Sequence, residues 1–339
     1  MTTWDDLNAR SRGLWTRLLG RRVLERLAQA PDLAALTDEL HGLGLPLPDK
    51  GPVYPADLEL AARRRAALSL EILARWAAHR RDMLAIIFED EERRSIIALL
   101  RGAVAHAPPE LRLSTLLPTP HLPERALEEL ARQPTTAAVA ALLQAWDHPL
   151  AGALLPAAGE AEPDLLHLEV LVHRAWAERS LKAMRRFTRT GPLLRYIRQT
   201  IDLENCLTVL TLADEKDARV AEFWLDGGSA LELDEAQKAV ATGTAPAAGR
   251  LLASAFGTSP IAAVLRDPEQ HERGIEAGLL RARLTELKQR ARQNPLSPAC
   301  FLSFALSLRA ELLDLCRIIW GRSLGAPSTV LTATMASVP

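Results

Sequence analysis

The stretch DLENCLTVL at positions 202–210 places an acidic residue, a polar residue three positions later and then an apolar run. The same order occurs in ERRSIIALL at positions 92–100 and in ELLDLCRII at positions 311–319. The three copies start about 110 residues apart, and an interval this constant indicates an internal repeat. The sequence therefore predicts that one helical unit occurs three times.

A second pattern lies upstream of each copy and supports the same repeat. It consists of an apolar residue, a Glu, four residues and an Arg, at positions 58–64, 168–174 and 275–281. A shorter echo pairs LERLAQAP at 24–31 with LEELARQP at 127–134. We predict three related units, called repeats 1, 2 and 3, each with two small helices followed by a long helical hairpin. They span 1–106, 107–215 and 216–339.

Composition and periodicity both favour an all-α fold. Ala, Leu, Arg and Glu dominate the chain, whereas only two Tyr and six Phe are present and β-branched residues are not clustered. Leu280, Leu284, Leu287 and Ala291 recur at helical spacing and form one apolar stripe. The period alone leaves a solenoid, a bundle or a ring of three open.

Charge and cysteine content restrict the functional class. The chain has 339 residues, with 41 Lys and Arg against 42 Asp and Glu, so no overall field attracts nucleic acid. A basic group at Arg10, Arg12, Arg17, Arg21 and Arg22 is interpreted as a solvated helix face. Three cysteines form no disulfide framework, and we see neither a signal peptide nor a transmembrane segment. We expect a cytoplasmic protein without a membrane-spanning segment.

The Glu and Arg of the upstream pattern are five residues apart, about 140° around a helix, so they do not pair with each other. We hypothesise that each Arg instead pairs with the acidic residue of the following hairpin helix. Such partly buried pairs would set helix register more than they add stability. The three predicted pairs are Arg64 with Glu92, Arg174 with Asp202, and Arg281 with Glu311.

Patterns that could carry catalysis are weak. The run FEDEE at 88–92 is superficially similar to the magnesium-binding helices of prenyl-chain enzymes, but no convincing second acidic motif faces it, so we interpret it as a solvated helix end. The eight histidines lack zinc spacing, and the glycines at 227, 228 and 243 lack the lysine of a phosphate loop. Cys206 lies in an apolar run and is interpreted as a core residue. We expect no catalytic, cofactor or metal site.

Two tryptophans are candidate interface anchors. Trp224 stands beside the Asp-Gly-Gly turn at 226–228, and Trp320 precedes Gly321. Interfaces are enriched in Trp, although core packing explains these positions equally well.

The middle repeat resembles a known family. LEVLVHRAWAER at 168–179, followed by YIRQTIDLEN at 196–205, is similar to segments of the C subunit of the V/A-type ATPases, the family that includes the vacuolar d subunit. In the third repeat, the glycine turn at 227–228 and RAELLDLCRIIWG at 309–321 agree with that family. Departures are Ser95 in place of a frequent Asn, His173 in place of an acidic residue, and the scarcity of tyrosines.

The resemblance implies three related helical domains arranged as a funnel with pseudo-threefold symmetry. It implies a non-catalytic rotor subunit that sits on the cytoplasmic face of the membrane proteolipid ring and receives the central shaft, with those subunits as partners. The alternative is a helical scaffold or adaptor protein unrelated to rotary ATPases.

Overall fold

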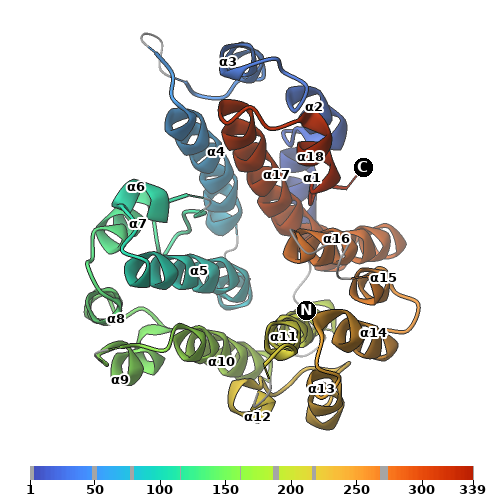
Figure 1. The fold of residues 1–339 in the computed structure, drawn as a ribbon. Coiled ribbons are helices and arrows are strands. Elements are labelled where there is room, and N and C mark those ends of the chain that lie inside the picture. The colour runs from blue at the N-terminus through green and yellow to red at the C-terminus, as the bar shows by residue number, and fades with distance from the viewer. Residues whose placement is uncertain are drawn as a thin grey trace. The chain divides into compact units, whose positions relative to one another are not determined.

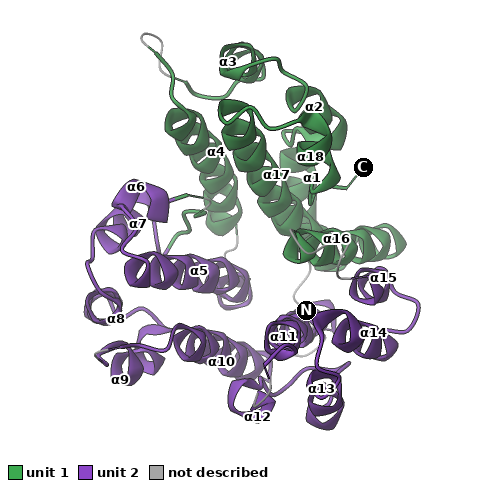
Figure 2. Ribbon diagram, in the orientation of Figure 1, with its two compact units in different colours: residues 1–78, 114–120, 273–339 green, residues 79–113, 121–272 purple. Residues whose placement is uncertain are grey.

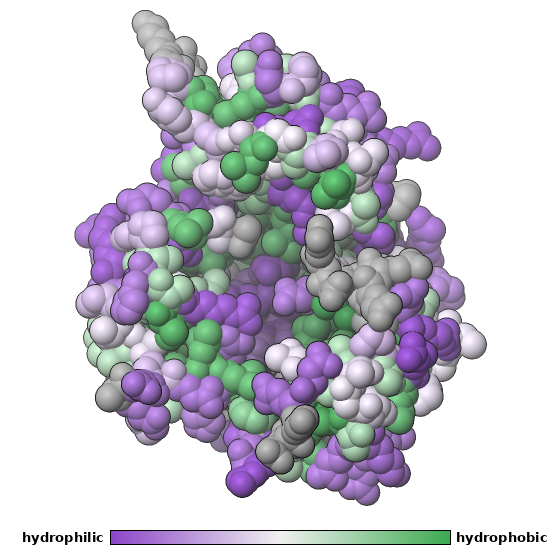
Figure 3. Space-filling model, in the orientation of Figure 1, coloured by the Kyte–Doolittle hydropathy of each residue, from purple (hydrophilic) through white to green (hydrophobic). Residues whose placement is uncertain are grey.

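A computed structural model describes residues 4–47, 52–76, 80–114, 116–160, 162–185, 191–215, 219–267 and 274–338. Figure 1 shows that helices make up the fold, and the described residues contain no strand. The predicted all-α class is confirmed. No helix among these residues is long and apolar enough to span a bilayer. On the face drawn in Figure 3, hydrophilic residues cover much of the surface, with hydrophobic residues in smaller groups among them.

The chain forms two compact units that divide it differently from the predicted repeats (Figure 2). Unit 1 contains residues 1–78, 114–120 and 273–339, and unit 2 contains residues 79–113 and 121–272. Unit 1 therefore joins the two ends of the chain. The compact units group residues by contact and the repeats group them by sequence, so the boundaries at 106 and 215 stay a prediction.

Unit 1 is built around one long helix. Its core includes Phe301, which stacks on Trp4 with ring centroids 5.1 Å apart, and Phe304, which lies 6.1 Å from the Trp15 ring. The long helix, α17, packs against α16, α4 and α1 and has buried residues on all its faces, as expected for a helix at the centre of a core. The helices are α1 (Asp5–Trp15), α2 (Gly20–Leu27), α3 (Leu33–Gly42), α4 (Pro55–Arg75), α16 (Ile275–Gln293), α17 (Ala299–Ser323) and α18 (Ser328–Ala333).

Unit 2 is built on a layer of long helices. The pair α5 and α10 packs together, α11 contacts α10, and α13 and α14 cover α11. These helices are α5 (Arg81–Val104), α6 (Pro109–Arg112), α7 (Glu124–Ala131), α8 (Thr136–Ala145), α9 (Leu155–Ala158), α10 (Leu165–Met184), α11 (Gly191–Leu212), α12 (Val220–Phe223), α13 (Leu233–Val240), α14 (Ala245–Ala255) and α15 (Pro260–Arg266), with a short 3₁₀ helix at Ala151–Ala153.

Local sequence signals explain where several helices start. An N-cap side chain accepts a hydrogen bond from a backbone amide of the first turn, which satisfies one of the otherwise free donors there. Asp32, Thr135, Asp164, Thr244 and Ser259 cap α3, α8, α10, α14 and α15 in this way.

Candidate functional site

The acidic run at 88–92 lies in the middle of α5, where its carboxylates are buried. Glu89, Asp90, Glu91 and Glu92 each expose no more than 6% of their surface. The interpretation of this run as a solvated helix end is therefore wrong. Arginines and histidines of unit 2 face the carboxylates, and buried charges of this kind persist only when they are paired.

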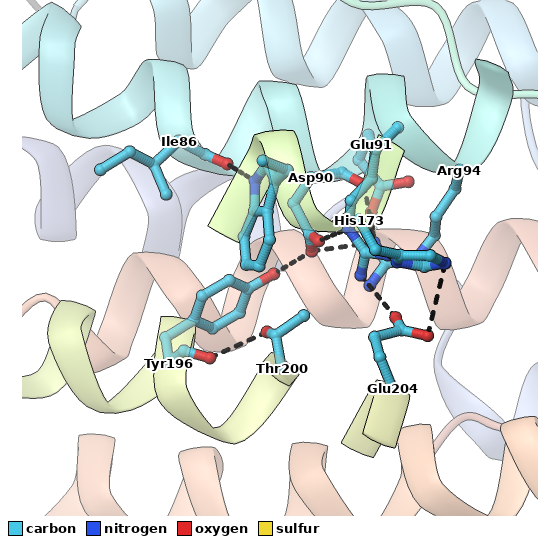
Figure 4. Close-up of polar contacts among 10 residues, drawn as sticks. Ile86, Asp90, Glu91, Arg94, His173, Tyr196, Thr200 and Glu204 are labelled. Atoms are coloured by element: carbon cyan, nitrogen blue, oxygen red, sulfur yellow. Dashed lines mark hydrogen bonds and ion pairs between the residues drawn. The ribbon is translucent and has the colours of Figure 1, made fainter. Parts of the chain in front are cut away.

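Arg93 is the centre of the resulting ion-pair network, and its partners Asp90, His173 and Glu204 are labelled in Figure 4. Its guanidinium lies 2.7 Å from Asp90 Oδ1 on the same helix and 2.6 Å from Glu204 Oε1 on α11. It also contacts His173 Nδ1 on α10, and its Cζ carbon lies 4.9 Å from the centre of the Trp176 ring. Arg93 is fully buried, and through these contacts it joins α5, α10 and α11.

Asp90 is the second junction of the network. Its Oδ2 accepts hydrogen bonds from Arg94 at 2.9 Å and from the Tyr196 hydroxyl at 2.6 Å. Figure 4 shows Tyr196 reaching from α11 toward this carboxylate. Beside it, the Trp176 indole donates to the Ile86 carbonyl at 3.2 Å. Every polar atom named here has a partner, so the network satisfies the charges that it buries.

The network fixes protonation states as well as positions. Burial alone would raise the pKa of Glu204, but Arg93, His173 and Arg94 lower it to about 2. Burial lowers the pKa of His173 to about 4, so its ring is neutral near pH 7. The neutral ring accepts from Arg93 through Nδ1, which places its proton on Nε2, 3.9 Å from Glu204.

Two further ion pairs flank the network along α5 and α10. Arg179 Nε lies 3.0 Å from Glu89, and Arg101 makes a two-pronged contact with Glu169 at 2.6 and 2.7 Å. Residues later in α5 contact residues earlier in α10, as expected for two helices that pack antiparallel. We call the whole set from Glu89 to Arg101, with its partners on α10 and α11, the α5 seam.

Glu92, one member of the predicted Arg64 pair, has partners within unit 2. His148 Nε2 lies 3.2 Å from Glu92 Oε2, and His121 Nδ1 lies 3.4 Å from Oε1. A hydrogen bond to Glu92 raises the pKa of His121, although partial burial opposes this. Arg64 is exposed and belongs to unit 1, so its pairing with Glu92 stays a prediction.

Arg174 and Asp202 hold the same segment, 222–231, through separate contacts. Arg174 donates to the carbonyls at 222 and 224, each at 3.2 Å. Asp202 accepts from the amides at 229, 230 and 231, and Asn205 bonds both the amide and the carbonyl of Leu225. A Cβ on Gly228 would collide with the Asp202 carboxylate, which explains this glycine. The predicted residues thus meet at one segment rather than through a shared ion pair.

Arg281 and Glu311 also have separate partners in unit 1. Arg281 donates to the carbonyl of Met335. Glu311 accepts from the amide of Leu19, just before α2, and lies 3.8 Å from Arg65. Burial raises the pKa of Glu311 to about 7, although Arg65 and the backbone amides of Leu19 and Gly20 oppose the shift.

The two candidate tryptophans have different environments. Trp320 exposes 36% of its surface, and its indole donates to buried Glu59 on α4. Trp224 is half-buried, and its carbonyl accepts from Arg174. Their use as interface anchors stays a prediction.

Comparison with known proteins identifies the family. Residues 7–332 match the family described as ATP synthase (C/AC39) subunit. The chain belongs to this family. Among curated proteins no match was found. The predicted relationship to the C subunit of the V/A-type ATPases is therefore confirmed, and it covers nearly the whole chain.

As a C/AC39 subunit, the chain belongs to a non-catalytic family of rotary ATPase components. Burial raises the pKa of the Cys206 and Cys316 thiols and so suppresses the reactive thiolate. In the part of the chain that the structure describes, no group of three or more His, Cys, Asp or Glu side chains could hold a metal ion.

Sequence reasoning missed the α5 seam of this C/AC39 protein. The acidic run and Arg93 are adjacent in the sequence, but the partners that join Glu89, Asp90 and Arg93 to α10 and α11 lie 80 to 111 residues away. One signal was available. A surface helix keeps its charges on one face, whereas the consecutive charged residues at 89–94 surround the helix and interrupt an otherwise apolar stretch.

Proposed function

We propose that this chain is the coupling rotor subunit of a V/A-type rotary ATPase. In this role it joins the central shaft to the membrane proteolipid ring on the cytoplasmic face, and it serves ATP-linked ion transport without performing chemistry itself. The family match over residues 7–332 is the observation that carries the proposal.

The α5 seam fits the mechanical demand of such a role. Torque passes through a rotor without loss only if its helices do not slide past one another. A slip of one helical turn, about 5.4 Å, would separate Arg93 from Glu204 and Glu89 from Arg179, because these contacts are 2.6 and 3.0 Å long. Buried charges without partners cost several kcal/mol each, so the seam resists slipping.

Isolation from solubilised membranes tests the assignment. The tagged chain should co-purify with the proteolipid ring and the shaft subunits, and complexes lacking it should hydrolyse ATP without pumping ions. Recovery of the chain free of all these subunits would instead favour an adaptor function.

A variant can test the mechanical argument separately. Glu89→Gln weakens one contact of the seam, and the ratio of ions pumped to ATP hydrolysed should fall. Glu178→Gln, on the same helix as Arg179, serves as the control and should leave the ratio unchanged. An unchanged ratio in both variants would refute the role of the seam but not the assignment.

A further inference from the structure

The acidic residue that opens each copy of the triplicated pattern contacts the chain just before a short helix. Asp202 accepts from the amides at 229–231, which precede α13. Glu311 accepts from the amide of Leu19, the residue before α2. In both places the donors include backbone amides, which do not titrate near neutral pH. The start of each of these helices is therefore held by groups that keep their protons.

At the first copy of the pattern, the donor is a histidine. Glu92 lies in the middle of α5 and is fully buried, and His121 precedes the start of α7 by three residues. The Nδ1 atom of His121 lies 3.4 Å from Glu92 Oε1, and 48% of the His121 side chain is exposed. Protons from solvent can reach a ring that is half exposed. The contact that holds the start of α7 on α5 thus includes a side chain that titrates near neutral pH.

The other oxygen of Glu92 contacts a histidine that follows α8. The amide of Leu150 donates to His148 Nδ1 at 3.3 Å, so this nitrogen carries no proton. The proton is then on Nε2, which lies 3.2 Å from Glu92 Oε2 and donates to it. His148 makes both hydrogen bonds as a neutral ring. Glu92 therefore joins both ends of the α7–α8 pair to α5, and the end at His121 is the one that a further proton strengthens.

The charges that face His121 come from α5 and α10. The hydrogen bond to Glu92 and the negative charges of Glu92 and Glu89 raise the pKa of His121, whereas partial burial and Arg179 lower it. The balance raises this pKa above its ordinary value of 6.5. Folding therefore favours the protonated ring. The stabilisation is fully present below pH 6.5 and is lost as pH rises through the raised pKa.

We propose that His121 and Glu92 form a pH-dependent latch, which holds the start of α7 on α5 while the imidazole is protonated and loosens it when the proton leaves. We call this pair the α7 latch. Both residues and both helices belong to unit 2, so the proposal does not depend on the rotary function.

Hydrogen exchange of α7 tests whether the latch opens. Protection factors of the amides at 127–131 are measured by mass spectrometry at about pH 6 and about pH 8.5, with intrinsic rates corrected for pH. Protection should fall about two- to fivefold at the higher pH, the worth of one half-exposed ion pair. His121→Gln should remove this response, because Gln donates a hydrogen bond without a charge. His167→Gln, at an exposed histidine of α10 in the same unit, is the matched control and should keep it.

The comparison between these variants also removes any effect of pH on the whole chain, because such an effect would persist in His121→Gln. A titration of the His121 ring by NMR in the unaltered chain gives a second measurement that needs no variant, and its midpoint should lie above pH 6.5. The proposal is overturned if the midpoint lies at or below 6.5. It is equally overturned if α7 is protected to the same extent at both pH values, or if His121→Gln keeps the response.

Discussion

Removal of the Arg93 charge should strongly destabilise unit 2. The guanidinium is fully buried, and Arg93→Met would leave Glu204 and one oxygen of Asp90 without their cation, at 2.6 and 2.7 Å respectively. Removing one partner of a buried ion pair costs about 3–5 kcal/mol.

Urea unfolding followed by the intrinsic fluorescence of the seven tryptophans, of which Trp176 lies beside Arg93, is a suitable assay. We expect Arg93→Met to lower the unfolding free energy by about 3–5 kcal/mol, and Arg93→Met with Glu204→Gln to recover at least half of that loss. The reasoning would be refuted by a loss below about 1 kcal/mol, or by a double variant as unstable as the single one.

The same contacts support three further predictions. The pKa of Glu311 is raised to about 7, so folding favours its protonated form. The contribution of Glu311 to stability should be fully present below pH 4.5 and be lost as pH rises through 7, and Glu311→Gln should remove this part of the pH dependence in urea titrations at several pH values. Asp202→Asn should lower the unfolding free energy by about 1–3 kcal/mol and accelerate hydrogen exchange of the amides at 229–231, whereas unchanged exchange would show that Asp202 does not hold this segment. Arg101→Gln should lower the unfolding free energy by less than about 1 kcal/mol in the same urea assay, because Arg101 is more than half exposed. A loss comparable to that of Arg93→Met would show that exposure does not determine how much these ion pairs stabilise the protein.

Much of the fold could be predicted from local sequence patterns. The stripe from Leu280 to Ala291 lies in α16, and the apolar runs of the repeat lie in α5, α11 and α17. Helical periodicity and capping residues act within a few positions of each other, so they can be read without knowing the tertiary structure.

The polar contacts were predicted less well, because a charged side chain can reach several partners of the right sign. Arg174 and Asp202 were expected to pair, yet both hold the backbone of 222–231. Free amides and carbonyls of an irregular segment must find partners when they are buried, and side-chain pairing rules take no account of this demand.

By itself, the sequence determined the all-helical class, the triplicated pattern and the relationship to the C/AC39 family. These three conclusions depend on residue type and spacing, which can be read along the chain without knowing what packs against it. Only the tertiary structure decided that the acidic run at 88–92 is buried and that Arg93 faces Glu204. A charge is solvated or paired according to what packs against it, and here the packing partners come from helices about a hundred residues away along the chain.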